Sequence, residues 1–193
     1  MTSLSEVDID TIIERLTPAR VRAFQILQVG LVLGIMVMLV MILFLFGLGR
    51  ETIPGEFSDE RVRGLSMLVA IMVLVALIVG QLMYRRLLSP ARIRDYASRP
   101  LGNRRSGIID DPAEKVLTLM QQAMLVRLCI YDIPVLFGLV VCLTELVSGV
   151  IFAYPQYMLI TIPAFAQLAF LAVTFPTRER LIRIAREKVL QAR

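Results

Sequence analysis

The fold is decided by the stretch LCIYDIPVLFGLVVCLTELV, residues 128–147. It is 20 residues long and almost entirely apolar, which suits a helix that crosses a hydrocarbon core of ~30 Å. One acid, Asp132, lies well inside it. Placing a carboxylate there costs roughly 2.5 to 3.5 kcal/mol on insertion scales. We therefore expect Asp132 to have a partner, a bound proton or a function.

The composition predicts a membrane protein. Of the 193 residues, 57% are hydrophobic and the mean hydropathy is +0.73, whereas a soluble domain has about 45 to 50% apolar residues. Four runs are long enough to cross a bilayer, at about residues 23–48, 65–84, 113–147 and 157–175. The third run includes a cytoplasmic extension of several turns. The sequence therefore predicts an all-α membrane protein with four transmembrane helices.

Lysine and arginine are unevenly distributed among the segments that flank these runs. Seventeen lie in the leader, the stretch from Arg85 to Lys115 and the tail, whereas three lie between the first two runs and none between the last two. Because an excess of these residues marks the cytoplasmic side, we expect a bacterial cytoplasmic (inner) membrane protein with both termini in the cytoplasm. The asymmetry accounts for the net charge of +5 without a nucleic-acid partner, although the arginines could attract anionic lipid.

Residues 1–18 are predicted to be an amphipathic cytoplasmic segment. An apolar stripe recurs at helical spacing, formed by Ile9, Ile12, Ile13 and Leu16. Such a helix either lies at the membrane interface or docks onto a partner. Thr17-Pro18 predicts a break before the first span, and residues 19–193 are predicted to be a single four-helix transmembrane domain.

Two basic segments lie outside the spans. Residues 85–112 are predicted to be a cytoplasmic loop, because they contain Ser89-Pro90 and other turn-forming residues, and residues 178–193 form a basic tail. Asp110-Asp111-Pro112 indicates the start of the next helix, with Pro112 at or near its first position and Glu114 in its first turn.

The two halves of the chain resemble each other. Residues 31–34 align with residues 135–138 at an offset of 104, and the second and fourth spans end in comparable Pro- and Arg-containing stretches. This pattern indicates either two tandem hairpins related by duplication or the ordinary similarity of apolar helices. At the same offset, Gln28 corresponds to Asp132.

Polar side chains of the four spans fall at similar depths near the cytoplasmic side, counted at ~1.5 Å of rise per residue. The candidate intramembrane polar site consists of Asp132, Gln28, Gln81, Gln25 and Tyr131. These groups either hydrogen-bond to each other and fix the bundle, or Asp132 binds a proton or cation. Arg127 is five residues from Asp132 and points to another side of the helix, and Glu145 is expected at the outer interface.

Prolines and small residues inside the spans leave further alternatives open. Pro134 and Pro163 predict kinks, which accompany function in some membrane helices and are ordinary architecture in others. Gly30 and Gly34 are spaced so that two helices could approach closely, either within one chain or between copies.

An enzyme is not predicted. The chain has no histidine, which removes the commonest metal ligand and general base, and no nucleophile elbow, P-loop, dinucleotide or zinc-binding motif occurs. Cys129 and Cys142 are too far apart along one helix for a disulfide. We therefore expect no catalytic residues, no cofactor and no metal.

Four short motifs carry a resemblance. They are Leu16-Thr17-Pro18-Ala19-Arg20, Arg127-Leu128, the stretch Asp132 to Gly138, and Phe175-Pro176-Thr177-Arg178-Glu179-Arg180. Together they resemble a family of uncharacterised bacterial four-helix integral membrane proteins. That family has glutamate followed by glycine where this chain has Asp132 and Ile133. The resemblance implies four spans and a special acid at Asp132, and it implies no reaction.

Two functions from different classes fit this sequence. The first is a non-enzymatic small subunit or assembly factor of a larger membrane complex, with the lipid bilayer and a protein partner or further copies of the chain as its partners. The second is a proton- or cation-coupled transporter or channel component that uses Asp132.

Overall fold

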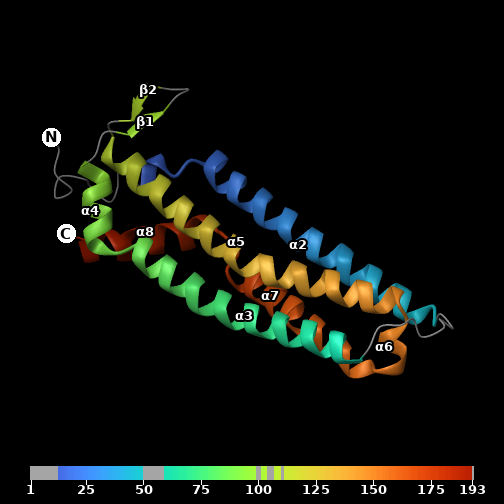
Figure 1. The fold of residues 1–193 in the computed structure, drawn as a ribbon. Coiled ribbons are helices and arrows are strands. Elements are labelled where there is room, and N and C mark those ends of the chain that lie inside the picture. Colours follow the sequence, from blue (N-terminus) through green and yellow to red (C-terminus); the bar gives the residue numbers. More distant parts are fainter. Residues whose placement is uncertain (1–12, 50–58, 99–100, 104–106, 110, 193) are drawn as a thin grey trace. The chain divides into compact units, whose positions relative to one another are not determined.

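The structure is a computed structural model that describes residues 13–49, 59–98, 101–103, 107–109 and 111–192. Within these residues the fold is helical apart from one pair of three-residue strands (Figure 1). The elements are α2 (Pro18–Gly47), α3 (Asp59–Leu87), α4 (Pro90–Ser98), β1 (Leu101–Asn103), β2 (Gly107–Ile109), α5 (Pro112–Val147), α6 (Val150–Ala153), the 3₁₀ helix η2 (Pro155–Thr161), α7 (Ile162–Val173) and α8 (Arg178–Ala192).

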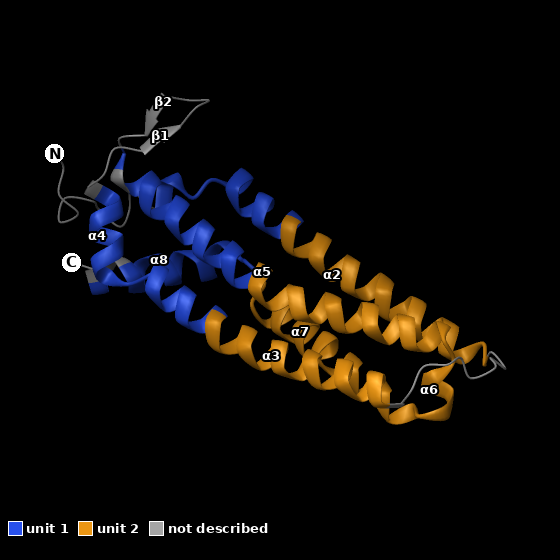
Figure 2. Cartoon of the chain, in the orientation of Figure 1, with its two compact units in different colours: residues 1–26, 80–128, 176–193 blue, residues 27–79, 129–175 orange. Residues whose placement is uncertain are grey.

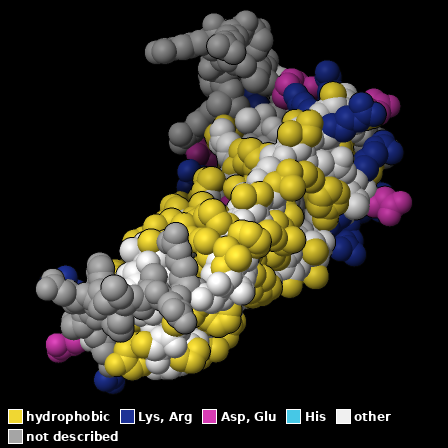
Figure 3. Space-filling view, turned by 90° about the vertical axis from the view of Figure 1, so that its right-hand side faces the viewer, with side chains coloured by type: hydrophobic (Ala, Val, Ile, Leu, Met, Phe, Trp, Pro, Cys, Tyr) yellow, Lys and Arg dark blue, Asp and Glu magenta, His cyan; other side chains and the backbone are white. Residues whose placement is uncertain are grey.

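Four helical segments are long and apolar enough to cross a membrane, which confirms the prediction of four candidate spans. They are Pro18–Gly47, Glu60–Leu87, Ala113–Val147 and Pro155–Val173. Helices suit this composition because they satisfy every interior backbone donor and acceptor within the segment. Helix α2 begins at Pro18, where the sequence predicted a break. Most of the apolar side chains of α2 and α3 are exposed, and hydrophobic side chains cover much of the surface seen in Figure 3.

The fourth candidate span is not a single α-helix. Its first part is the 3₁₀ helix η2, and Pro163 lies in the first turn of α7, where its missing backbone donor breaks no helical hydrogen bond. Pro163 therefore marks the junction between two helix types, whereas Pro134 lies inside α5 as the sequence indicated.

The chain divides into two compact units, which are coloured separately in Figure 2. Unit 1 comprises residues 1–26, 80–128 and 176–193, and unit 2 comprises residues 27–79 and 129–175. Unit 1 contains 18 of the 21 Lys and Arg residues and 10 of the 16 Asp and Glu residues. It is therefore the strongly basic part of the chain, whereas unit 2 holds most of the apolar sequence.

Unit 1 has a hydrophobic core of its own. Short helices from the segments that the sequence analysis treated as a loop and a tail contribute to it: α4 provides Ile93 and Ala97, and α8 provides Leu181 and Ala185. The N-terminal turns of α5 supply the largest share, and the buried Lys115 donates from Nζ to the Ala97 carbonyl at 3.3 Å. The predicted loop 85–112 thus contains α4 and the antiparallel pair β1–β2, and most of the tail is helical.

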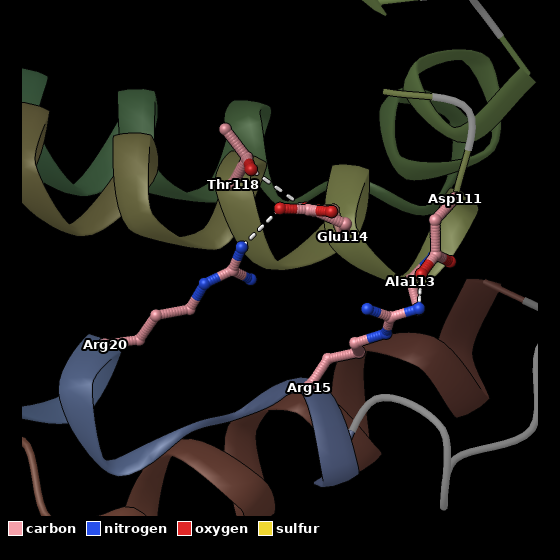
Figure 4. Close-up of polar contacts among 6 residues, drawn as sticks. All are labelled: Arg15, Arg20, Asp111, Ala113, Glu114 and Thr118. Atoms are coloured by element: carbon pink, nitrogen blue, oxygen red, sulfur yellow. Dashed lines mark hydrogen bonds and ion pairs between the residues drawn. The ribbon is translucent and has the colours of Figure 1, made fainter. Parts of the chain in front are cut away.

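Ion pairs connect Arg15 and Arg20, on either side of the start of α2, to the start of α5 (Figure 4). Asp111 Oδ1 accepts a hydrogen bond from the Ala113 backbone N–H at 3.0 Å, which confirms the predicted helix start. Asp111 also forms an ion pair with Arg15 at 3.2 Å, and Glu114 in the first turn of α5 pairs with Arg20. The predicted amphipathic segment lies largely in residues 1–12, outside the described residues.

Unit 2 contains the apolar parts of α2, α3 and α5 together with α6, η2 and α7. Helix α5 approaches α3 and η2 at Gly138, where an added Cβ atom would lie 3.0 Å from Val69 Cγ1 and 3.4 Å from Ile160 Cγ2. Helix α2 contacts α6 through Phe46 and Phe152, whose rings stack with centroids 5.6 Å apart. A side chain at position 138 would require Val69 to shift by a few tenths of an ångström, so glycine suits this close approach of the helices.

Candidate functional site

The buried polar site of unit 2 is centred on Asp132 of α5 and Gln167 of α7. Both side chains are turned away from the protein surface, with 5% and 6% exposure. Gln167 Nε2 donates a hydrogen bond of 2.8 Å to Asp132 Oδ1. The other carboxyl oxygen, Oδ2, is buried and accepts no hydrogen bond from a described residue. The carboxyl group therefore has one satisfied and one unsatisfied oxygen.

Gln28 joins α2 to the same helix. It is 4% exposed, and its Nε2 donates to the Leu171 carbonyl of α7 at 2.6 Å. Leu171 belongs to the last turn of α7, where carbonyl groups have no partner further along the helix. Gln28 supplies the missing donor, so this hydrogen bond also caps α7. Gln167 and Leu171 are four residues apart and lie on one side of α7.

The remaining predicted residues divide between the two units. Tyr131 of unit 2 is buried, and its ring meets that of Phe170 edge-on at 5.5 Å between centroids. Gln25 belongs to unit 1 and donates to the Pro176 carbonyl at 3.1 Å. Gln81 is half-buried near the end of α3 and also belongs to unit 1. The structure thus brings Asp132, Gln28 and Tyr131 together through α7.

Gln167 is the member of this site that the sequence analysis missed. It is the only polar residue of α7, which is the signal that could have identified it. The polar site was predicted from residues that lie near the cytoplasmic ends of the spans, and Gln167 lies further along its span from the basic tail that begins at Arg178. In the structure, the donor to Asp132 is Gln167, while the Arg127 guanidinium carbon lies 4.8 Å from the centroid of the Tyr84 ring in unit 1.

A second buried acid lies in the last turn of α5. Glu145 was expected at the outer interface and was given no role, yet it is only 3% exposed. Both of its carboxyl oxygens are buried, and neither accepts a hydrogen bond within the described part of the chain. Cys142, one turn earlier on α5, is also fully buried. Both buried acids of α5, Asp132 and Glu145, therefore carry unsatisfied oxygens.

No metal-binding cluster is found among the residues that the structure describes, because no three His, Cys, Asp or Glu side chains gather there. Carboxyl and amide groups dominate the buried polar groups of unit 2. These groups can form hydrogen bonds between helices or hold a proton.

Comparison of the chain with known protein families, with curated proteins and with solved structures finds no match. The resemblance to four-helix bacterial membrane proteins therefore stays a prediction from the short motifs.

Proposed function

We propose that this protein is a non-enzymatic, multi-pass protein of the bacterial inner membrane that serves as a small subunit or assembly factor of a larger membrane complex. The observation that carries the proposal is the exposed face of α2. Gly30 and Gly34 lie on it, both are exposed, and a Cβ atom added to either would meet nothing within 4 Å. Small residues at this spacing let a second helix approach closely, and unit 2 does not use them for its own packing.

The buried polar groups support a structural role. Gln28 bonds to a backbone carbonyl and Gln167 bonds to Asp132, so both amides connect helices. Contacts of this kind contribute about 0.6 kcal/mol each and sometimes up to ~1.7. They hold the bundle in one arrangement and thereby present a defined apolar surface to a partner.

The charge distribution supports an orientation with both termini in the cytoplasm. Unit 1 contains both termini and 18 of the 21 Lys and Arg residues, and Arg85 and Arg86 occupy the last turn of α3. Basic residues that flank the spans are retained on the cytoplasmic side. Unit 1 would accordingly lie on that side.

Crosslinking in native membranes tests the subunit role. A photoreactive residue at Val37, one turn beyond Gly34, should crosslink to one discrete protein, and that protein should also co-purify in mild detergent. Leu77 on α3 is the matched control, since both side chains are exposed, at 64% and 53%. Gly34→Leu should abolish the crosslink without unfolding the protein. A stable monomer that shows no crosslink from Val37 would contradict the proposal.

A second candidate function is a proton- or cation-coupled transporter or channel component. The observation that favours it is Asp132 Oδ2, which is buried without a donor from the described residues. An ion site predicts that Asp132→Asn assembles normally and loses the coupled flux, whereas a structural role predicts a modest loss of stability. Purified protein in liposomes that shows no pH- or cation-dependent flux would rule this function out.

A further inference from the structure

Glu145 is the most completely isolated acid of unit 2 among the described residues. It lies in the last turn of α5 and is 3% exposed, and neither carboxyl oxygen accepts a hydrogen bond from a described residue. Asp132, by comparison, receives a hydrogen bond from Gln167. A buried ionised carboxylate is strongly unfavourable unless it is paired and hydrogen-bonded. The isolation of Glu145 therefore requires something that neutralises it.

The local electrostatics work against a negative charge at this position. The C-terminus of a helix carries a partial negative charge, and the last turn of α5 contains no basic residue. The described cations of unit 2 are Arg61 and Arg63, and both are exposed. Cys142 is the titratable side chain that interacts with Glu145 from the preceding turn, and a buried thiol supplies no positive charge.

We propose that Glu145 binds a proton and is a neutral carboxylic acid in the folded protein. A metal ion is the less suitable ligand, because hard cations take several oxygen ligands and the described residues offer no cluster of three acids, cysteines or histidines. The proton comes from solvent water and bonds to one carboxyl oxygen. The site is separate from Asp132, because 13 residues of helix correspond to ~20 Å along the axis and to the opposite side of α5.

This inference goes beyond the proposed subunit role and does not depend on it. A neutral Glu145 requires only that the carboxyl group stays buried in unit 2. If the crosslinking experiment failed, Glu145 could still be neutral. If Glu145 proved to be ionised, the exposed face of α2 would still support the subunit role.

Infrared spectroscopy of the full-length protein in detergent tests the assignment. A neutral carboxylic acid has a C=O stretching band that is well separated from the two bands of a carboxylate. The difference spectrum of wild type minus Glu145→Gln at neutral pH should contain the acid band and should be unchanged by added sodium, potassium or calcium ions. Glu60, which is exposed on α3, is the matched control, and Glu60→Gln should remove carboxylate bands instead.

Each outcome is decisive. Carboxylate bands in the Glu145→Gln difference spectrum would overturn the proposal, and conversion of the acid band by one of the added cations would identify a metal ion as the ligand instead. Gln has the size of a neutral Glu, so the variant should fold with its thermal stability retained. Should it fail to fold, Glu145→Asp keeps an acid at this position and should shift the acid band, whereas an ionised group would shift only carboxylate bands.

Discussion

Gln167 Nε2 and Asp132 Oδ1 are 2.8 Å apart, and their hydrogen bond links α7 to α5 through two side chains that are almost fully buried. Gln28 reaches the same helix at the Leu171 carbonyl. Helix α7 is thus the element to which both Gln28 and Asp132 are hydrogen-bonded. These two hydrogen bonds link α7 to α2 and to α5.

Removing one partner of this hydrogen bond should destabilise the protein more than removing both. Asp132→Leu leaves the Gln167 amide buried without its acceptor, which costs about 1 to 3 kcal/mol, whereas Asp132→Asn keeps an acceptor and should cost less. The double variant Asp132→Leu/Gln167→Leu should be more stable than the sum of the single effects predicts. Unfolding free energies measured in mixed micelles test this cycle.

The matched control for this cycle is Gln156→Leu, because Gln156 is an exposed residue of η2. Strict additivity of the two single substitutions would mean that the hydrogen bond adds nothing to stability.

Gly138 should tolerate no large side chain. An added Cβ atom would lie 3.0 Å from Val69 Cγ1, so Gly138→Leu should destabilise the protein by roughly 1 to 3 kcal/mol through overpacking. Gly34→Leu is the matched control, because nothing lies within 4 Å of an added Cβ there. Thermal unfolding of the two purified variants measures the difference. Equal melting temperatures would show that α5 does not need a glycine at its approach to α3.

The sequence was sufficient to predict the four candidate spans. Four apolar runs, the break at Pro18 and the cap at Asp111 each depend on local chemistry, and the structure confirms them. Contacts between helices were harder to predict, because a uniformly apolar helix such as α2 gives no periodic signal for the side that it buries. The pairing of Gln167 with Asp132 likewise depends on which sides of α7 and α5 face each other.

The shorter helices were missed for a different reason. Turn-forming residues and basic charge dominate residues 85–112 and 178–193, so these segments were expected to be a loop and a tail. Apolar pairs at i and i+4 were nevertheless present, Ile93 with Ala97 and Leu181 with Ala185, and all four residues are buried in the core of unit 1. For Glu145, the position in the sequence indicated the depth within the span but could not indicate that the side chain is buried.

The N-terminus of α5 should depend on the cap more than on the ion pair. Asp111→Ala removes the acceptor for the Ala113 N–H and should cost ~1 kcal/mol. Asp111→Asn keeps a capping oxygen and loses only the partner of Arg15, which should cost about 0 to 1 kcal/mol because surface ion pairs contribute little. Amide hydrogen exchange in the first turn of α5 distinguishes the two. Equal protection in both variants would contradict the capping role.

The proposed orientation predicts which cysteine variants a membrane-impermeant thiol reagent can reach. In a background with Cys129 and Cys142 replaced by alanine, Gln156→Cys in η2 should react in intact spheroplasts, since the short connection that contains it carries no Lys or Arg. Lys188→Cys in α8 should react only after permeabilisation, because the proposed orientation places the basic residues of unit 1 in the cytoplasm. A reporter fused after Arg193 should be active on the cytoplasmic side for the same reason. Labelling of Lys188→Cys in intact spheroplasts would reverse the orientation, and labelling of both positions from outside would be incompatible with four spans.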